Sequence, residues 1–298
     1  MRVLVTGAGG LVGRAVSEYC RSEGDLVFSY DHQSLDISDL DSVNRVLRED
    51  KPETVINCAA WTNVDGCEGN RERAFAVNAA GPENLARASR EMSAKLVTIS
   101  TDYVFAGTKD GFYTQRDQPQ PESVYGLSKL EGERLAQRAY ARTVVVRTGF
   151  VFGSGGSNFL STVIERARRG EKLKAIRDAY GTPSYAPDLA RRLRDLAQLD
   201  LPGTFHVVNA GEGVSYEEFA RAALDLSGSA STSLESVEMD SLKRPAPRPR
   251  NSRLRCLLSD AIGLTPLPFW QESLASFAAL SSQSEAAPKS LDCPPSLA

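Results

Sequence analysis

Residues 2–13 of the chain read Arg-Val-Leu-Val-Thr-Gly-Ala-Gly-Gly-Leu-Val-Gly. The apolar run Val3–Val5 predicts a buried strand, and the apolar residues at helical spacing in Leu11–Ser22 predict a helix. A glycine-rich turn joins the two elements. This order of strand, glycine turn and helix is typical of α/β proteins that hold a nucleotide at their first turn.

The glycines of this turn have the spacing G-x-x-G-x-x-G. Because glycine has no Cβ, the turn can be tight and the backbone can approach a pyrophosphate closely. The helix N-terminus then offers free N–H groups and the positive end of its dipole. We expect five residues here to bind the pyrophosphate of a dinucleotide cofactor: Gly7, Gly10, Leu11, Val12 and Gly13.

The rest of the first 150 residues alternates short apolar runs with amphipathic segments. The expected strands are residues 25–30, 54–58, 95–100 and 143–147, and the expected helices are residues 42–49, 72–92 and 125–139. Strands that alternate with helices predict parallel β-α-β units. Continuous β-branched runs are typical of strands covered on both faces. We therefore predict an α/β fold with a Rossmann-type doubly wound parallel sheet.

The pattern changes after residue 153, which predicts a second, smaller α/β domain that is discontinuous along the chain. We expect a nucleotide-binding domain of residues 1–152 plus 178–212, and a substrate domain of residues 153–177 plus 213–282. Ser215 and Glu218 are spaced as a capping box at the start of a helix. The Ser-, Ala- and Pro-rich residues 283–298 show no periodicity and are expected to form a flexible tail.

Composition excludes several function classes. The 298 residues carry 35 Lys and Arg against 38 Asp and Glu, so a broad basic face for nucleic acid is not expected. No apolar run approaches the roughly 18 residues of a membrane helix, and the N-terminus does not resemble a signal peptide. The five widely spaced cysteines and two histidines predict neither a disulfide framework nor a metal site. We expect a cytoplasmic protein with no nucleic-acid or membrane partner.

Asp31 ends the second expected strand, at a position where an acid can accept hydrogen bonds from the adenosine ribose. A carboxylate there would repel a 2′-phosphate, and no Arg or Lys lies between Asp31 and Asp39 to bind that phosphate. The residues alone therefore favour NADH over NADPH. Asp36, which precedes Ile37, can accept from the adenine amino group, and we expect both residues to bind the cofactor.

A second set of residues predicts proton transfer. Thr101 follows the fourth expected strand, and Tyr125 and Lys129 form a Y-x-x-x-K motif at the start of a helix. Residues i and i+4 share a helix face, so we expect the ammonium group near the phenol and a lowered pKa of Tyr125. Such a tyrosine can exchange a proton with a substrate oxygen. Thr101 can hold the reacting carbonyl, and Lys129 can also bond the nicotinamide ribose.

These motifs resemble the extended short-chain dehydrogenase/reductase superfamily and, within it, the dTDP-4-dehydrorhamnose reductase family. The similarity runs from residue 1 to about residue 280. Four stretches carry the resemblance to the family: Asn57–Asp65, Ser100–Phe105, Val124–Glu133 and Arg248–Leu254.

The resemblance implies reduction of the C4 ketone of dTDP-4-dehydro-L-rhamnose by NADPH or NADH, with Tyr125 as the proton donor. It also implies a Mg²⁺ requirement and a homodimer, although we assign no acidic cluster to a metal. Cofactor contacts are implied for Ala59, Ala60 and Trp61. Substrate contacts are implied for Thr101, Asp102, Tyr103, Phe150 and Arg248.

The chain departs from the family at three places. Phe150 stands where a Trp that packs against the sugar is common, Gly66-Cys67 replaces a commoner Lys-Ala pair, and the stretch after residue 282 has no recognised counterpart. Arg248 lies in a basic segment, residues 243–255, that would suit a substrate pyrophosphate or form a solvated loop.

Two further hypotheses stay open. A sugar-nucleotide epimerase or 4,6-dehydratase would use the same nucleotide domain, but a dehydratase typically has Glu where this chain has Tyr103. The regulatory beta subunit of methionine adenosyltransferase also resembles these reductases, so the chain could be a nucleotide-binding partner without turnover.

Overall fold

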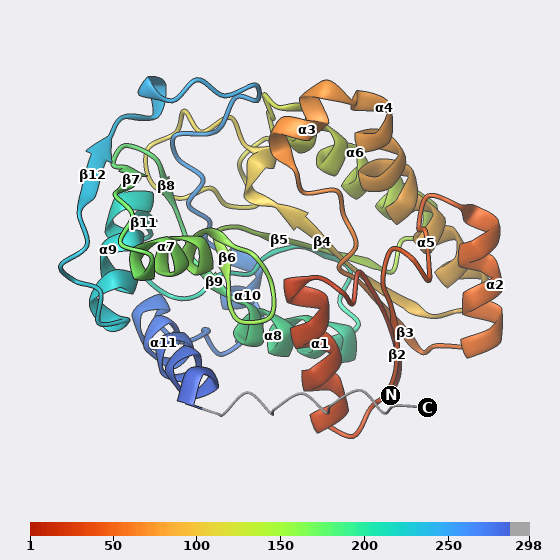
Figure 1. Cartoon of the computed structure of the whole chain (residues 1–298). Coiled ribbons are helices and arrows are strands. Elements are labelled where there is room, and N and C mark those ends of the chain that lie inside the picture. The colour runs from red at the N-terminus through yellow and green to blue at the C-terminus, as the bar shows by residue number, and fades with distance from the viewer. Residues whose placement is uncertain (287–298) are drawn as a thin grey trace, which may run out of the picture.

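The computed structural model describes residues 1–286. Its centre is a six-stranded sheet in the order β10-β5-β4-β3-β1-β2, and all neighbouring strands in it are parallel (Figure 1). The strands are β1 (Arg2–Thr6), β2 (Leu26–Tyr30), β3 (Thr54–Asn57), β4 (Lys95–Thr101), β5 (Thr143–Thr148) and β10 (Gly203–His206). The predicted Rossmann-type α/β fold is confirmed.

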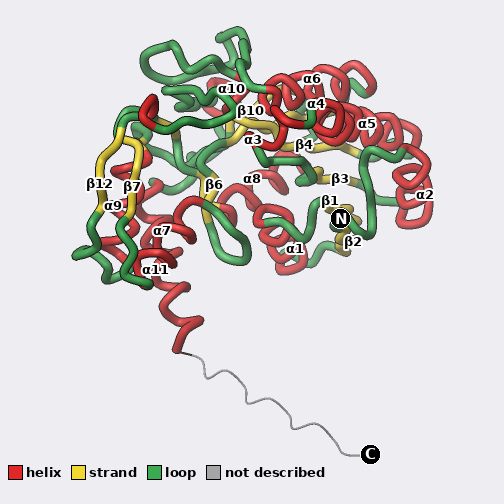
Figure 2. Tube along the Cα trace, turned by 45° about the horizontal axis from the view of Figure 1, so that its top comes forward, coloured by secondary structure: helices red, strands yellow, loops and turns green. Residues whose placement is uncertain are grey.

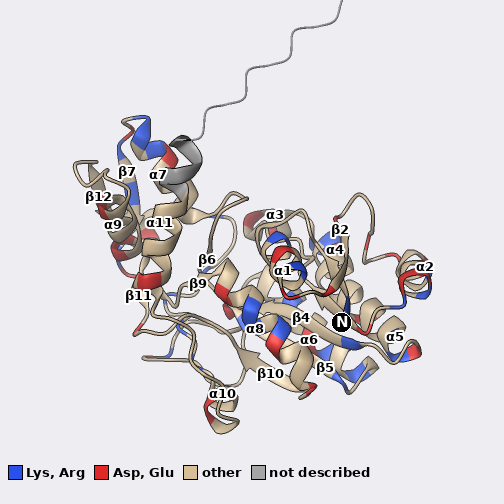
Figure 3. Ribbon diagram, turned by 90° about the horizontal axis from the view of Figure 1, so that it is seen from below, with Lys and Arg blue, Asp and Glu red and all other residues tan. Residues whose placement is uncertain are grey.

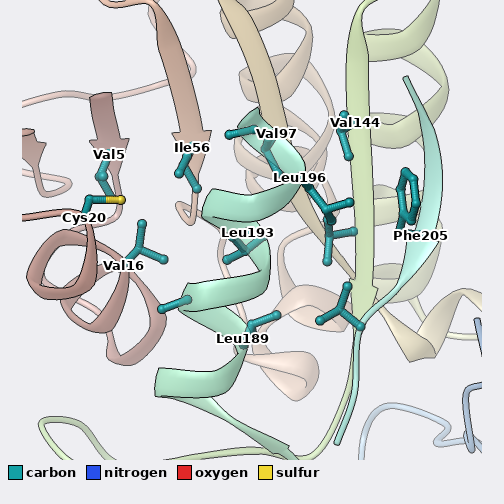
Figure 4. Packing of buried hydrophobic residues seen from close by; sticks show 14 of the residues in the cluster. Val5, Val16, Cys20, Ile56, Val97, Val144, Leu189, Leu193, Leu196 and Phe205 are labelled. Carbon is teal, nitrogen blue, oxygen red and sulfur yellow. The ribbon is translucent and has the colours of Figure 1, made fainter. Parts of the chain in front are cut away.

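Helices cover both faces of this sheet, as a doubly wound fold requires. Alternate residues of each strand serve the two faces: Val5 packs toward α1 and α8, whereas Leu4 packs toward α2, α5 and α6. Figure 4 shows Leu189, Leu193 and Leu196 of α8 lying against the strands. The helices are α1 (Leu11–Ser22), α2 (Leu40–Asp50), α5 (Gly81–Glu91), α6 (Val124–Ala139) and α8 (Ala186–Leu199).

The expected single helix over residues 72–92 is divided into α4 (Arg71–Phe75), a π-helical turn (Ala76–Ala80) and α5. Pro82 has no N–H to give to the carbonyl four residues earlier, which is that of Asn78. The wider turn sends the Asn78 side chain to the backbone of Trp61, where Oδ1 accepts from the N–H at 2.8 Å and Nδ2 donates to the carbonyl at 3.0 Å. The interruption therefore positions the segment that follows β3.

Beyond the sheet, three helices lie beside a small strand pair in one part of the molecule (Figure 2). Buried apolar residues of this part form clusters of their own. Ser215 and Glu218 form the predicted capping box. The elements are α7 (Phe159–Arg168), α9 (Tyr216–Leu226), α11 (Trp270–Ala286), β7 (Leu173–Ile176) with β12 (Leu234–Val237), and β8 (Tyr180–Gly181) with β11 (Val214–Ser215). The proposed domain boundaries stay a prediction.

Several short elements were not predicted: α3 (Val64–Gly69), β6 (Val151–Phe152), β9 (Ser184–Tyr185) and α10 (Leu257–Ala261). The long helix α11 was also missed, and it continues to Ala286, past residue 283 where we expected a tail to begin. The remainder of that expected tail lies outside the described residues.

The proline-rich segment around residue 249 crosses over the loop that follows β4. A Cβ on Gly107, whose φ is +83°, would lie 2.5 Å from the Cα of Pro249, so only glycine permits this approach. Asn251 Nδ2 donates to the carbonyls of Lys109 and Gly111 at 2.5 and 2.7 Å. The segment therefore braces the loop behind the end of β4.

Within residues 1–286, no helix is long and apolar enough to cross a membrane. Figure 3 shows basic residues interspersed with acidic ones along several helices in that view. Cys20, Cys58, Cys67 and Cys256 are free thiols, and Cys293 lies outside the described residues.

Candidate active site

A cavity of about 1170 Å³ opens where the carboxyl ends of β1, β3 and β4 meet. Open α/β sheets bind ligands at this edge. The cavity brings together every predicted cofactor-binding and catalytic residue, and every predicted substrate-binding residue except Arg248. These are Gly7, Gly10, Leu11, Val12, Gly13, Asp31, Asp36, Ile37, Ala59, Ala60, Trp61, Thr101, Asp102, Tyr103, Tyr125, Lys129 and Phe150.

The glycine turn is packed so tightly that side chains are excluded. A Cβ on Gly7, whose φ is +65°, would lie 2.6 Å from the Ala59 nitrogen, and a Cβ on Gly13 would lie 2.2 Å from the Gly7 carbonyl oxygen. Gly10, the N-cap of α1, provides no side-chain acceptor. The first N–H groups of α1 therefore remain available to an anion, and this cradle fits a dinucleotide pyrophosphate.

At the far end of the cavity, Asp31 is held as a carboxylate by its own turn. Its Oδ1 accepts from the Ser34 hydroxyl at 2.7 Å and from the backbone N–H groups of Ser34 and Gln33 at 2.9 and 3.0 Å. These bonds, that of the Ser34 hydroxyl above all, hold the pKa of Asp31 below its usual range. These bonds all use Oδ1, and the expected contact of Asp31 with a ribose stays a prediction.

Arg14 also lines the cavity and was missed by sequence reasoning. Its Nε donates to the carbonyl of Gly9 at 3.0 Å, and a Cβ on Gly9 would contact the Cβ of Asp31 at 3.3 Å. Arg14 follows the glycine motif directly, so its position in the sequence is a signal that could have been used.

The predicted proton-transfer residues meet at the end of β4. Ser123 caps α6 by accepting from the Gly126 N–H at 3.1 Å, and Tyr125 and Lys129 follow within the first two turns. The hydroxyl of Thr101 lies near enough to that of Tyr125 to affect its pKa, and it donates to Asp102 Oδ1 at 3.0 Å. A carbonyl oxygen near both hydroxyls would find a proton donor and a second polar partner there.

Our expectation that Lys129 lowers the pKa of Tyr125 was wrong. Burial raises the pKa of the Tyr125 hydroxyl, and the nearby Thr101 hydroxyl only partly opposes the increase. The Lys129 Nζ donates to the Ile99 carbonyl at 2.7 Å, and burial lowers the pKa of this ammonium group to about 8. Helical spacing predicted the shared face but not the degree of burial, which dominates both shifts.

Asp102 is a buried carboxyl with only 3% of its surface exposed. Its Oδ2 has no hydrogen-bond partner among the described residues and lies where a Cβ on Gly149 would meet it at 2.4 Å. Burial raises the pKa of Asp102 to about 6, and the Ser252 and Thr101 hydroxyls oppose the increase. An acid that is partly protonated near neutral pH therefore adjoins Thr101.

An aromatic wall closes the other side of the cavity. The ring of Tyr103 stands edge-on to that of Tyr125 at 5.9 Å, and Phe150 stacks on Tyr216 at 4.3 Å. The hydroxyls of Tyr103 and Tyr216 also lie near enough to affect one another's pKa. Sequence reasoning missed Tyr216, because it begins a helix about 90 residues after the Y-x-x-x-K motif and no local pattern singles it out.

Arg248 is not among the residues that line the cavity. Its guanidinium forms a bidentate ion pair with Asp65, donating to Oδ1 at 2.9 Å and to Oδ2 at 2.8 Å. The backbone N–H of Ala246 donates to the same carboxylate at 3.1 Å. These contacts, the Arg248 bond first, hold the pKa of Asp65 below its usual range. The structure thus gives Arg248 an intramolecular partner, and its contact with substrate stays a prediction.

The Mg²⁺ implied by the family resemblance finds no support. Among residues 1–286, no three His, Cys, Asp or Glu side chains are close enough together to hold a metal ion. Asp31, Asp36 and Asp102 line the same cavity, but Asp31 and Asp36 are each held by a neighbouring serine, Ser34 and Ser38. The described residues therefore do not fit a bound Mg²⁺.

The family model for the RmlD substrate binding domain matches residues 1–282. A dTDP-4-dehydrorhamnose reductase of Mycolicibacterium smegmatis is 38% identical over 276 residues, which cover 92% of this chain and 84% of the relative. A dTDP-4-keto-6-deoxy-D-glucose reductase of Streptomyces niveus is 33% identical over 274 residues, 92% of this chain and 95% of the relative.

A solved structure supports the same grouping. The dTDP-4-dehydrorhamnose reductase of Bacillus anthracis, in complex with NADP, is 34% identical and superposes with a TM-score of 0.90. The match covers 94% of this chain and 99% of that chain.

The environment of Asp102 leads to a stability prediction. Its pKa in the folded chain, about 6, is above the ordinary 3.8, so the folded state binds more protons and loses stability as the pH rises from about 4 to about 6. Asn at this position cannot ionise. We therefore expect the free energy of unfolding of Asp102→Asn at pH 7.5 to exceed that of the wild type by on the order of 2 kcal/mol. Urea denaturation at pH 4.5 and 7.5 measures this difference.

The matched control is Asp36→Asn, which removes an exposed carboxylate from the same cavity and should show the wild-type change between the two pH values. A wild-type pH dependence in Asp102→Asn, or a loss of stability at pH 7.5, would contradict the assignment of a raised pKa to Asp102.

Proposed function

Because the chain belongs to the RmlD substrate binding domain family, whose relatives described above are reductases of dTDP-sugars, we propose that it reduces the C4 ketone of dTDP-4-dehydro-L-rhamnose to give dTDP-L-rhamnose. The supporting observation is one cavity that joins the glycine cradle and Asp31 to Thr101, Tyr125 and Lys129. We further propose that the dTDP-sugar binds between the sheet and the part of the chain formed by α7 and α9.

In the proposed mechanism, Tyr125 transfers its hydroxyl proton to the ketone oxygen and becomes a phenolate, while the carbonyl carbon becomes a CH–OH group. Thr101 orients the oxygen through its own hydroxyl, and the charge of Lys129 stabilises the phenolate. The reduced nicotinamide supplies the hydride when it is bound. Gly7, Gly10 and Gly13 let the backbone approach its pyrophosphate.

A second sugar is a specific alternative, because the Streptomyces niveus relative acts on a dTDP-4-keto-6-deoxy-D-glucose. Phe150 also stands where the family often has Trp, and its stacking partner Tyr216 enlarges the aromatic surface beside the reacting group. This wall is the part of the cavity that we expect to distinguish one hexose from another.

Turnover with the purified chain tests the function. We expect oxidation of the reduced nicotinamide, followed by absorbance, when dTDP-4-dehydro-L-rhamnose is added, and dTDP-L-rhamnose as the product by chromatography. dTDP-4-keto-6-deoxy-D-glucose is assayed in parallel. Oxidation with this second sugar alone would replace the proposed substrate. No oxidation with either sugar would remove the reductase proposal and favour the non-catalytic hypothesis.

The role of Tyr125 can be tested separately. Tyr125→Phe keeps the ring but removes the transferable proton, so we expect kcat to fall by about 100-fold or more, with the Kd for NADH unchanged. Rapid kinetics and fluorescence titration measure the two quantities. Tyr140→Phe, a buried tyrosine outside the cavity, is the control and should retain the wild-type rate. A Tyr125→Phe variant with full activity would rule out this proton donor.

We propose that the chain prefers NADH, because Asp31 is a fixed carboxylate at the adenosine end of the cavity. Asp31→Asn should raise the ratio of kcat/KM for NADPH to that for NADH by about tenfold, since one repulsive charge near the 2′-phosphate is lost. Asp36→Asn, in the same cavity, should leave the ratio unchanged. A wild-type preference for NADPH would instead assign the 2′-phosphate to Arg14.

A further inference from the structure

Three consecutive residues at the end of β4 each contact one residue on the same side of α6. The three helix positions are spaced four residues apart, so they lie on one face. Each contact uses a different group: a backbone carbonyl, a serine hydroxyl and a threonine hydroxyl. The pairs are Ile99 with Lys129, Ser100 with Glu133, and Thr101 with Tyr125.

Glu133 is the one member of this row that does not line the cavity. Its Oε1 accepts from the Ser100 hydroxyl at 2.5 Å and from Arg147 Nε at 2.9 Å, and its Oε2 accepts from Arg147 at 2.6 Å. Ser100 and Arg147 are direct partners in the register of β4 and β5. One carboxylate therefore ties α6 to the two central strands beneath it.

The ion pair between Glu133 and Arg147 is almost fully buried, with 4% and 6% of the two residues exposed. Such pairs add little net stability, because desolvation offsets the attraction between the charges. Arg147 is also held over the ring of Phe105 at 5.2 Å. The arrangement is fixed from several sides, yet stability alone does not account for a buried charge at this position.

The charge of Glu133 acts on its neighbour one turn earlier. Burial lowers the pKa of Lys129 to about 8, and Glu133 opposes that decrease, as does Cys58 after β3. Arg147 on β5 faces Glu133, and His206 on β10 stays neutral near Arg147, because burial and that guanidinium lower its pKa to about 4. Within this cluster, Glu133 is the carboxylate that supports the protonated form of Lys129.

We propose that Glu133 is a positioning residue of the proton-transfer site, which fixes α6 against β4 and keeps Lys129 charged beside Tyr125. The inference rests on the proposed reductase function. Glu133 itself touches no reacting atom.

Three variants separate the effect of the Glu133 charge from the effects of its hydrogen bonds and of the stability of the fold. Glu133→Gln keeps the shape but removes the charge. The single variant leaves the buried Arg147 without its carboxylate, which can prevent folding. The double variant Glu133→Gln with Arg147→Met removes both charges, and it is used for the test if the single variant does not fold. Glu131→Gln is the matched control, since Glu131 lies on the same helix and forms solvent-exposed ion pairs with Arg134 and Arg138.

The first measurement needs no turnover. In protein labelled with ¹³C at lysine Cε, the resonance absent from Lys129→Arg is assigned to Lys129 and titrated with pH. We expect its midpoint to fall by about one pH unit in Glu133→Gln, since an attractive charge has been removed. It should fall less in the double variant, which also loses the repulsive charge of Arg147. Glu131→Gln should titrate as the wild type does. A wild-type midpoint in both folded Glu133 variants overturns the proposal.

The second measurement is the pH profile of kcat with the keto-sugar. Activity that needs charged Lys129 is lost as the pH rises through its pKa, so this limb should move to lower pH in the Glu133 variants, with KM for the sugar changed less than threefold. If the high-pH limb of the kcat profile does not move, and the variants show only a raised KM or a lowered Tm, then Glu133 has a merely structural role. If the wild type turns over neither sugar, the proposed function fails, while the resonance still decides whether Glu133 supports Lys129.

Discussion

The contact between the backbones of Gly7 and Gly13 sets the geometry on which the cavity depends. A Cβ on Gly13 would lie 2.2 Å from the Gly7 carbonyl, and one on Gly7 would lie 2.6 Å from the Ala59 nitrogen. Helix α1 therefore begins directly over the ends of β1 and β3, which lie side by side in the sheet. The chain runs outward in opposite directions from these two strands, and a crevice opens at such a switch point.

Local patterns predicted the fold and most of the cavity, because parallel strands bring their carboxyl ends to one edge. Thr101, which follows such a strand, could therefore be placed from local patterns, whereas Ala59 was implied only by the family resemblance. Tyr216 and the Asn78 contact with Trp61 could not be placed in either way. The first depends on how a distant helix packs, and the second depends on a π-helical turn that Pro82 accompanies.

The sequence predicted the positions of the site residues better than it predicted their pKa values and charge partners. Helical spacing correctly placed Tyr125 and Lys129 on one face, but the pKa of Tyr125 is raised, because burial outweighs any neighbouring charge. Arg248 belongs to a basic segment, and the structure adds an ion-pair partner, Asp65, that the charge of the segment did not indicate; its contact with substrate stays a prediction. In both cases the decisive quantity is the three-dimensional environment of the group, which a sequence pattern does not contain.

Strained and unsatisfied groups help to distinguish function from packing here. Among the described residues, the non-glycine positions with positive φ are Lys51, Ser93, Asp200 and Phe150. The first three lie at or just beyond helix ends, where a left-handed residue completes the helix. Phe150 ends no helix. It lines the cavity beside the buried carboxyl of Asp102, and the backbone strain it adds is the kind that persists where a site needs a side chain aimed in one direction.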